Sequence, residues 1–228
     1  DDVPRSTVAR EHWEKRWHEA MPLSGAALPW ILHAHVRGLS REEADRVRSG
    51  EWTLEDIIRE TDHSIHFDLR LATDRFEGWW GITLFGGSMA DNRETLRPFQ
   101  LMGDDKAAIQ SAPKLFGPLA WLHVGTDRPL VVPPRGVGST SRTWSAFWAI
   151  DRGTYRLGFA RQHAVELFLE GQTLEGRFLW QYAQLGDRRE WLFTRPADQR
   201  PYAETHDRDA VIREVRERGQ RYLVWPKD

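Results

Sequence analysis

From Ser64 onward the chain is divided into short segments rich in aromatic and β-branched residues, separated by Gly, Pro, Asp or Asn. Segments of this kind at short intervals are typical of strands joined by turns, and many in succession predict a sandwich or a barrel. The sequence therefore predicts a mainly β protein, a compact antiparallel β-barrel. The strands are expected at residues 30–36, 65–71, 78–85, 98–102, 119–124, 143–150, 165–169, 177–182, 190–194 and 221–225.

Helices are expected at the periphery of this barrel. Ser40-Arg41-Glu42-Glu43 is a capping box that begins a helix ending at Gly50, and Thr53 begins a second short helix with a similar cap. Residues 7–20 have the apolar spacing of an amphipathic helix, and residues 207–218 have the charge pattern of an exposed one. The expected helices are thus N-terminal, inserted and C-terminal.

Three regions follow from these elements. An N-terminal helical extension is expected at residues 1–29, and a C-terminal helix and tail at residues 201–228. The barrel domain is expected at residues 30–200, with the two capped helices as an insertion at residues 40–60. No internal repeat or low-complexity linker divides the sequence further.

The composition excludes several classes of function. The chain has no cysteine, which excludes disulfides, zinc–thiolate sites and cysteine nucleophiles. The formal net charge is −2, so phosphate binding must come from a local cluster rather than from a global basic field. No apolar run approaches the roughly 18 residues that a membrane span needs, and no signal peptide is visible. We therefore expect a cytoplasmic location without membrane contact.

One strand combines metal-ligating and phosphate-binding side chains. In His66-Phe67-Asp68-Leu69-Arg70-Leu71 the polar residues alternate with apolar ones, so His66, Asp68 and Arg70 share one face of the strand. An imidazole and a carboxylate at this spacing can hold one divalent metal ion. An Arg beside them can clamp a phosphate oxygen or orient the carboxylate. The other interpretation is an exposed strand face with a His and an Asp–Arg ion pair.

A second strand supplies more histidines. His33 and His35 share one face of the expected strand at residues 30–36, where neither belongs in an apolar core. A barrel can bring this strand beside the first one. His63 lies nearer in sequence to His66, so His35, His33 and His63 all stay open as the residue that completes a metal site.

These motifs resemble the 3′-phosphoesterase domain of bacterial ligase D. His66–Leu71 (HFDLRL) is similar to its H-[YF]-D-[FL]-R-L motif, and Trp30–His35 resembles its V-I-Q-K-H strand, which ends in a metal-binding His. Residues 79–82, 148–155, 167–178 and 190–193 resemble further segments of that family in the same order. The resemblance spans roughly residues 30–200. It implies a compact barrel and Mn²⁺, or another divalent metal, held by His35, His66 and Asp68.

The sequence departs from this family in two places. The insertion at residues 40–60 separates two motifs that the family normally keeps a few residues apart. The family's H-P-L-D-Y segment, whose His and Tyr contact the phosphate, corresponds to Arg128-Pro129-Leu130-Val131-Val132. Arg128 can bind phosphate but cannot donate a proton near neutral pH. His123, expected on a strand, can replace the missing His, or it can be a structural barrel residue.

The resemblance implies a metal-dependent phosphoesterase that processes nucleic-acid 3′ ends during DNA repair. This hydrolase would remove a 3′-phosphate or a 3′-ribonucleotide, with catalytic roles for Arg70, Arg128 and His123. The alternative is a catalytically degenerate barrel that serves as a structural or interaction module, for example in a phage-derived particle or another larger protein assembly. A third hypothesis is a nucleic-acid binder without catalysis, whose affinity would depend on salt and not on metal.

Overall fold

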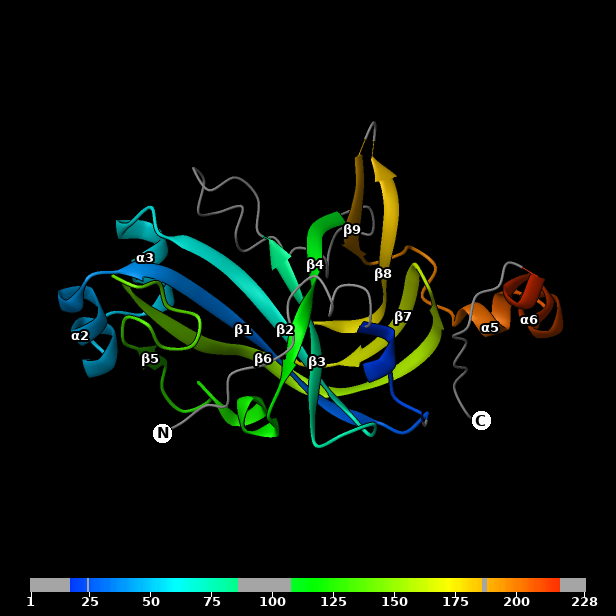
Figure 1. Ribbon diagram of the computed structural model, residues 1–228, viewed down its shortest axis with the longest axis horizontal. Helices are drawn as coiled ribbons and strands as arrows, with labels where there is room; N and C mark the ends of the chain where they lie inside the picture. The colour runs from blue at the N-terminus through cyan, green and yellow to red at the C-terminus, as the bar shows by residue number, and fades with distance from the viewer. Residues whose placement is uncertain (1–16, 24, 86–107, 186–187, 218–228) are drawn as a thin grey trace.

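The computed structural model describes residues 17–23, 25–85, 108–185 and 188–217. This part of the chain forms one antiparallel sheet of nine strands in the order β1-β2-β3-β4-β9-β8-β7-β6-β5 (Figure 1). Strand β1 also pairs with β6, which closes eight of the strands into a barrel, and β5 extends the sheet beside the first half of β6. The strands are β1 (Leu28–Leu39), β2 (Ser64–Thr73), β3 (Gly78–Phe85), β4 (Ala108–Gly117), β5 (Leu130–Val132), β6 (Trp144–Arg161), β7 (Ala164–Glu170), β8 (Glu175–Leu185) and β9 (Arg188–Thr194).

The expected fold class, a mainly β antiparallel barrel, is confirmed. Alternate side chains of the strands fill the barrel interior, and Trp30, Trp80 and Trp180 are among its largest buried members. The polar ends of these large rings are satisfied: the Trp80 indole donates to the Tyr155 hydroxyl (3.1 Å), and the Trp180 indole donates to the Ser111 hydroxyl (3.1 Å). Much of the high Trp content therefore belongs to the core.

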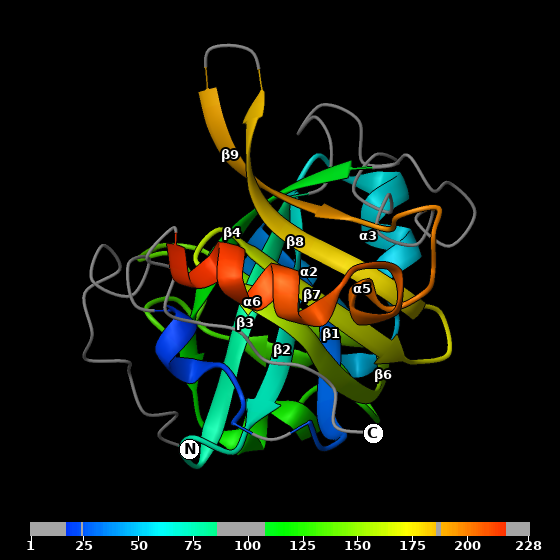
Figure 2. The same cartoon turned by 90° about the vertical axis from the view of Figure 1, so that its right-hand side faces the viewer.

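Four short α-helices and two 3-10 helices flank the barrel in the described part of the chain. α2 and α3 lie beyond one end of β1 and β2, whereas α5 and α6 lie on the opposite side of the molecule in Figure 1 and cross in front of the strands in Figure 2. Both predicted capping boxes are present, at Ser40 and at Thr53, and Gly50 ends α2 with a φ of 81°. The helices are η1 (Trp17–Ala20), α2 (Arg41–Ser49), α3 (Leu54–Glu60), η3 (Leu119–His123), α5 (Tyr202–Thr205) and α6 (Arg208–Glu217).

A second apolar layer covers part of the outer surface of the barrel. Trp121 of η3 and Val132 of β5 pack with Trp79 and Phe147, whose side chains lie on the outside of β3 and β6. This layer buries outward-facing residues of β1 and β2 that would otherwise face water. The outer face of these two strands is therefore an interior surface as well, and it carries the polar residues described below.

Asp151 holds the turn that joins β7 to β8. Its carboxylate accepts hydrogen bonds from the backbone N–H groups of Gln172 (3.0 Å), Thr173 (2.9 Å) and Leu174 (2.7 Å). Asp151 therefore has a structural role, because its carboxylate satisfies three backbone donors of this turn.

Several expected elements differ in the structure. Residues 119–124 were expected to form a strand, but the segment forms the 3-10 helix η3, which lets Trp121 and Leu122 pack onto the barrel. The strand expected at residues 143–150 continues through β6, because its second half pairs with β7. β4 and β5 were not predicted. Residues 1–16, 98–102 and 221–225, with their expected helix and strands, lie outside the described residues.

Every helix in the described ranges is too short or too polar to cross a lipid bilayer.

Candidate metal centre

The pairing of β1 with β2 brings the predicted ligands together. In this antiparallel register His35 lies opposite His66, and His33 lies opposite Asp68. Residues directly opposite each other in an antiparallel pair point to the same face of the sheet. The side chains of His33, His35, His66 and Asp68 therefore all lie on the outer face of the barrel, beneath the second apolar layer.

His35, His66 and Asp68 form a compact group that can hold a metal ion. The His35 Nδ1 atom is 2.9 Å from His66 Nε2, and the Asp68 carboxylate oxygens are 3.9 Å from His35 Nδ1 and 3.6 Å from His66 Nε2. Three atoms that each bind a divalent ion at about 2.1 Å, at angles near 90–110°, are about 3.0–3.5 Å apart. The observed separations are close to this range.

Asp68 is the electrostatic centre of the site. Its carboxylate is fully buried and lies 3.0 Å from an Arg70 nitrogen and 2.9 Å from Lys114 Nζ, and it also accepts a hydrogen bond from the Thr83 hydroxyl (3.2 Å). Burial alone raises the pKa of Asp68, but Lys114 and Arg70 outweigh it and hold this pKa well below its ordinary value. The carboxylate is therefore ionised, which is the form that binds a metal ion.

The two histidines stay neutral at physiological pH. Burial is the largest cause that lowers the pKa of His35 and of His66, and the attraction of Asp68 only partly opposes it. A neutral imidazole has a lone pair available, which is the form that binds a metal ion.

Arg70 is held rigidly in the site. Its guanidinium donates to Asp68 and to His33 Nδ1 (2.6 Å), and it lies over the Trp121 ring at 4.4 Å from the ring centre. Because His33 Nδ1 accepts this hydrogen bond, the proton of the neutral ring sits on Nε2, which donates to the Val124 carbonyl (2.8 Å). His33 thus orients Arg70, and it is not part of the ligand group.

Two buried polar atoms at the site have no hydrogen-bond partner, namely His35 Nε2 and Arg70 Nε. Buried polar atoms are nearly always satisfied, and each exception needs an explanation, such as strain, a catalytic role or a bound ion. Arg70 still has donor capacity beyond its bonds to Asp68 and His33.

The site is closed on one side and open on the other. The Phe147 ring stacks on the His35 ring at a distance of 4.0 Å, and Gly138 packs so closely that a Cβ atom there would lie 2.9 Å from His35 Nε2. On the opposite side, the side chains of His66 and Lys114 are 15% and 23% exposed. A ligand must therefore approach past His66 and Lys114.

The remaining predicted residues lie outside this group. The His63 ring is hydrogen-bonded to the Glu43 carboxylate of α2 (3.0 Å), so α2 holds it away from the ligand group. His123 is exposed at the end of η3, and Arg128 is exposed in the turn before β5. Among the residues that the structure describes, neither His123 nor Arg128 has a hydrogen bond or an ion pair with His35, His66 or Asp68.

The sequence reasoning missed Lys114 and Thr83. Thr83 of β3 lies opposite Asp68 of β2. The strand β3 was predicted correctly, so the alternation of side chains along it could have placed Thr83 on the face of the site. Lys114 lies on β4, opposite Gly81, and β4 was not predicted, because its Gln, Ser, Pro and Lys residues weaken the strand signal. The available signal was that Lys114 is one of only four lysines in an Arg-rich chain.

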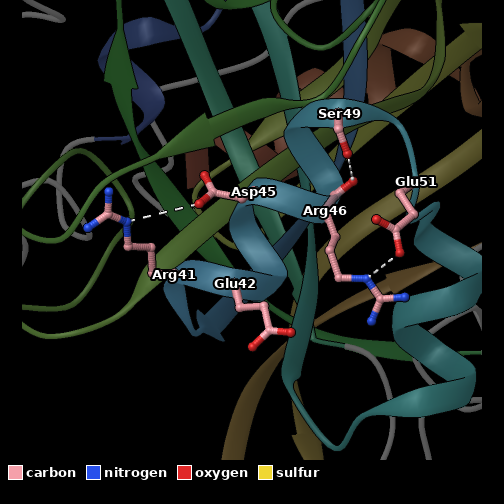
Figure 3. A pocket seen from close by; sticks show the side chains of 6 residues that line it. All are labelled: Arg41, Glu42, Asp45, Arg46, Ser49 and Glu51. Atoms are coloured by element: carbon pink, nitrogen blue, oxygen red, sulfur yellow. Dashed lines mark hydrogen bonds and ion pairs between the residues drawn. The ribbon is translucent and has the colours of Figure 1, made fainter.

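A shallow pocket elsewhere has a different character. It lies on the surface of α2, and its side chains neutralise one another through the pairs Arg41–Asp45 (4.0 Å) and Arg46–Glu51 (2.8 Å) (Figure 3). It contains none of the metal-site residues. Its lining is Arg41, Glu42, Asp45, Arg46, Ser49 and Glu51.

No protein-family model matches the chain, and no curated protein is significantly similar to it in sequence. The fold and the site define a class, an antiparallel β-barrel with a buried His–His–Asp group on its outer face.

Proposed function

We propose that this barrel is a metal-dependent phosphoesterase that acts on nucleic-acid 3′ ends. The observation that carries the proposal is the convergence of His35, His66 and Asp68 with two cationic side chains, Arg70 and Lys114, on one buried spot. The ligands account for metal binding and the cations account for an anionic substrate.

The donor set supports a divalent first-row ion. Two imidazoles and one carboxylate suit Mn²⁺, Fe²⁺ or Zn²⁺, and the absence of thiolate ligands disfavours a soft-metal site. We propose Mn²⁺ because the chain also resembles the ligase D phosphoesterase family in its HFDLRL motif. When bound, a divalent cation supplies electrophilic activation of a phosphoryl group.

The charge balance favours a phosphate ester over a neutral substrate. Two cations, Arg70 and Lys114, face the single carboxylate of Asp68, so these groups carry one excess positive charge before any metal binds. A divalent cation raises the excess to three. A phosphate monoester dianion offsets most of this charge, whereas a neutral ester offsets none of it.

The chain's own residues have separate roles in this proposal. Arg70, fixed by His33 and Asp68, offers donors to the non-bridging oxygens where negative charge develops. Lys114, paired with Asp68, adds a second positive charge on the partly exposed side of the site. Arg128 and His123 keep their predicted roles only as hypotheses, because the described geometry places neither beside the ligands.

The test measures Mn²⁺-dependent phosphate release from a DNA primer that carries a 3′-phosphate. We expect release with Mn²⁺, none after chelation, and a loss of about a hundredfold or more on Arg70→Gln. Arg156→Gln is the matched control, because Arg156 is exposed on β6, away from the site. Equal release by the parent and by the Asp68→Ala variant refutes the proposal.

One observation favours a second function, a barrel without catalysis that serves as a structural or interaction module. The Asp68 carboxylate already has cationic partners in Arg70 and Lys114, so the group is electrostatically satisfied without a metal. Calorimetry with Mn²⁺ separates the two functions. Binding that is lost on His66→Ala supports the enzyme, and no binding by the parent supports the module.

A further inference from the structure

The residues that surround the open side of the metal site have a consistent chemistry. On β1 the outer-face row runs His33, His35, Arg37, and the next strand places Ser64 opposite Arg37. On β3 the residue opposite His66 is Phe85. Arg37 and Phe85 therefore share the face of the candidate ligands, on either side of His66.

Both side chains are accessible. Arg37 is exposed, and Phe85 is 37% exposed, one of the few large apolar side chains in the described part of the chain that is not covered. Arg37 is also close enough to the site for its charge to act on His66 and Lys114. In contrast, the aromatic residues on the closed side, Trp121 and Phe147, are buried.

This arrangement restricts where the rest of a substrate can lie. A phosphate that contacts Asp68's cationic partners has the Trp121 and Phe147 layer on one side, so its ester group must project past His66. Strand spacings of about 4.8 Å and a rise of about 3.3 Å per residue place the Cα atoms of Arg37 and Phe85 about 12 Å apart. The projecting group passes between a cation and an exposed phenyl ring.

We propose that Arg37 and Phe85 form a subsite for the nucleotide that carries the reacting phosphate, with Arg37 contacting its neighbouring phosphodiester and Phe85 stacking on its base. Single-strand binding sites combine these two elements, a cation along the backbone and an aromatic ring beneath a base. This inference rests on the proposed function and adds the requirement that the substrate is a nucleic-acid strand. A simple phosphate monoester is then a poor substrate.

The test is fluorescence-anisotropy binding of labelled single-stranded DNA that ends in a 3′-phosphate, with and without Mn²⁺. A second probe has the same strand with an abasic terminal nucleotide, and inorganic phosphate serves as a competitor. We expect Phe85→Ala to raise Kd for the first probe about five- to hundredfold and to leave Kd for the abasic probe unchanged. We expect Arg37→Gln to raise Kd for both probes and to leave competition by phosphate unchanged.

Two control variants test whether the effect is local. Tyr182 on β8 is also 37% exposed, and Arg156 on β6 is exposed, so Tyr182→Ala and Arg156→Gln remove similar groups elsewhere on the barrel. Both controls should bind like the parent. Controls that weaken binding as much as Phe85→Ala and Arg37→Gln overturn the subsite.

The outcomes separate the subsite from the proposed catalysis. Phosphate release with unchanged binding by Arg37→Gln and Phe85→Ala refutes the subsite and supports the catalytic proposal. Binding that depends on both residues, without any phosphate release by the parent, supports the subsite and refutes catalysis. No measurable binding of either DNA probe by the parent refutes the subsite.

Discussion

His35 Nδ1 and His66 Nε2 lie 2.9 Å apart, although the two residues are separated by 31 positions in the sequence. Two helices, α2 and α3, occupy most of the chain between them. The antiparallel pairing of β1 and β2 places the two rings opposite each other regardless of the length of this connection. The pairing of β1 with β2, rather than closeness in the sequence, therefore sets the distance between the two rings.

Removing the Asp68 carboxylate should destabilise the metal-free protein. Asp68→Asn removes the carboxylate that pairs with the buried Arg70 and the partly buried Lys114. The expected loss in the free energy of unfolding is about 3–5 kcal/mol, measured by urea denaturation with chelator present. The double variant Asp68→Asn/Lys114→Met should recover part of this loss, and a single variant as stable as the parent would contradict the ion-pair network.

His33 should make stability depend on pH. Burial, followed by the charge of Arg70, lowers the pKa of His33 to about 3 from its ordinary value of 6.5. The folded state therefore binds this proton less readily than the unfolded state, so stability is complete above pH 6.5 and falls as the pH drops from 6.5 toward 3. The contribution reaches roughly 1.4 kcal/mol per pH unit.

The variant His33→Gln isolates this effect. A Gln amide can still accept from Arg70 and donate to the Val124 carbonyl, but it does not titrate. Urea denaturation between pH 4 and 7 should show a shallower pH dependence in this variant than in the parent. His123→Gln, at an exposed position, should retain the parent slope, and identical slopes for the parent and His33→Gln would refute the prediction.

A side chain at Gly138 should disturb the metal site through contact with His35. Gly138 has a φ of 79°, and a Cβ atom there would lie 2.7 Å from Phe147 and 2.9 Å from His35. Gly138→Ala should lower stability by about 1–3 kcal/mol and weaken Mn²⁺ binding measured by calorimetry.

Gly50 provides the matched control for this substitution. Its φ of 81° is nearly the same, but no atom lies within 4 Å of a Cβ placed there. Gly50→Ala should therefore cost stability through backbone strain and leave Mn²⁺ affinity unchanged. Equal metal affinities for the two Ala variants would show that Gly138 does not shape the site.

Two linked hydrogen bonds join three strands inside the barrel. The Trp80 indole donates to the Tyr155 hydroxyl, which donates to the Ala72 carbonyl at 2.5 Å. Tyr155→Phe leaves a buried donor and a buried acceptor unpaired, so the free energy of unfolding should fall by about 1–3 kcal/mol. Thermal unfolding measures this, with the exposed Tyr182→Phe as the variant that should remain near the parent.

Much of the fold could be predicted because strands and helix caps have characteristic patterns within a few consecutive residues. The segment at residues 78–85 agrees with β3 at both ends, and the capping boxes at Ser40 and Thr53 are present as expected. The failures occurred where the local signal was weak or ambiguous. Residues 119–124 are apolar enough for a strand, but packing of Trp121 on the outer face favours a 3-10 helix. β4 contains polar residues, so its sequence lacked the apolar pattern by which the other strands were predicted.

The sequence by itself determined the class of fold and the face that His66, Asp68 and Arg70 share, because the alternation of a strand is a local property with a period of two residues. Only the tertiary structure decided that His35 joins them, that His33 instead orients Arg70, that Lys114 completes the charge and that His63 belongs to the inserted helices. These relationships depend on strand register and on the layer that covers the outer face. Register is set by the packing of many side chains at once, so no short motif encodes it.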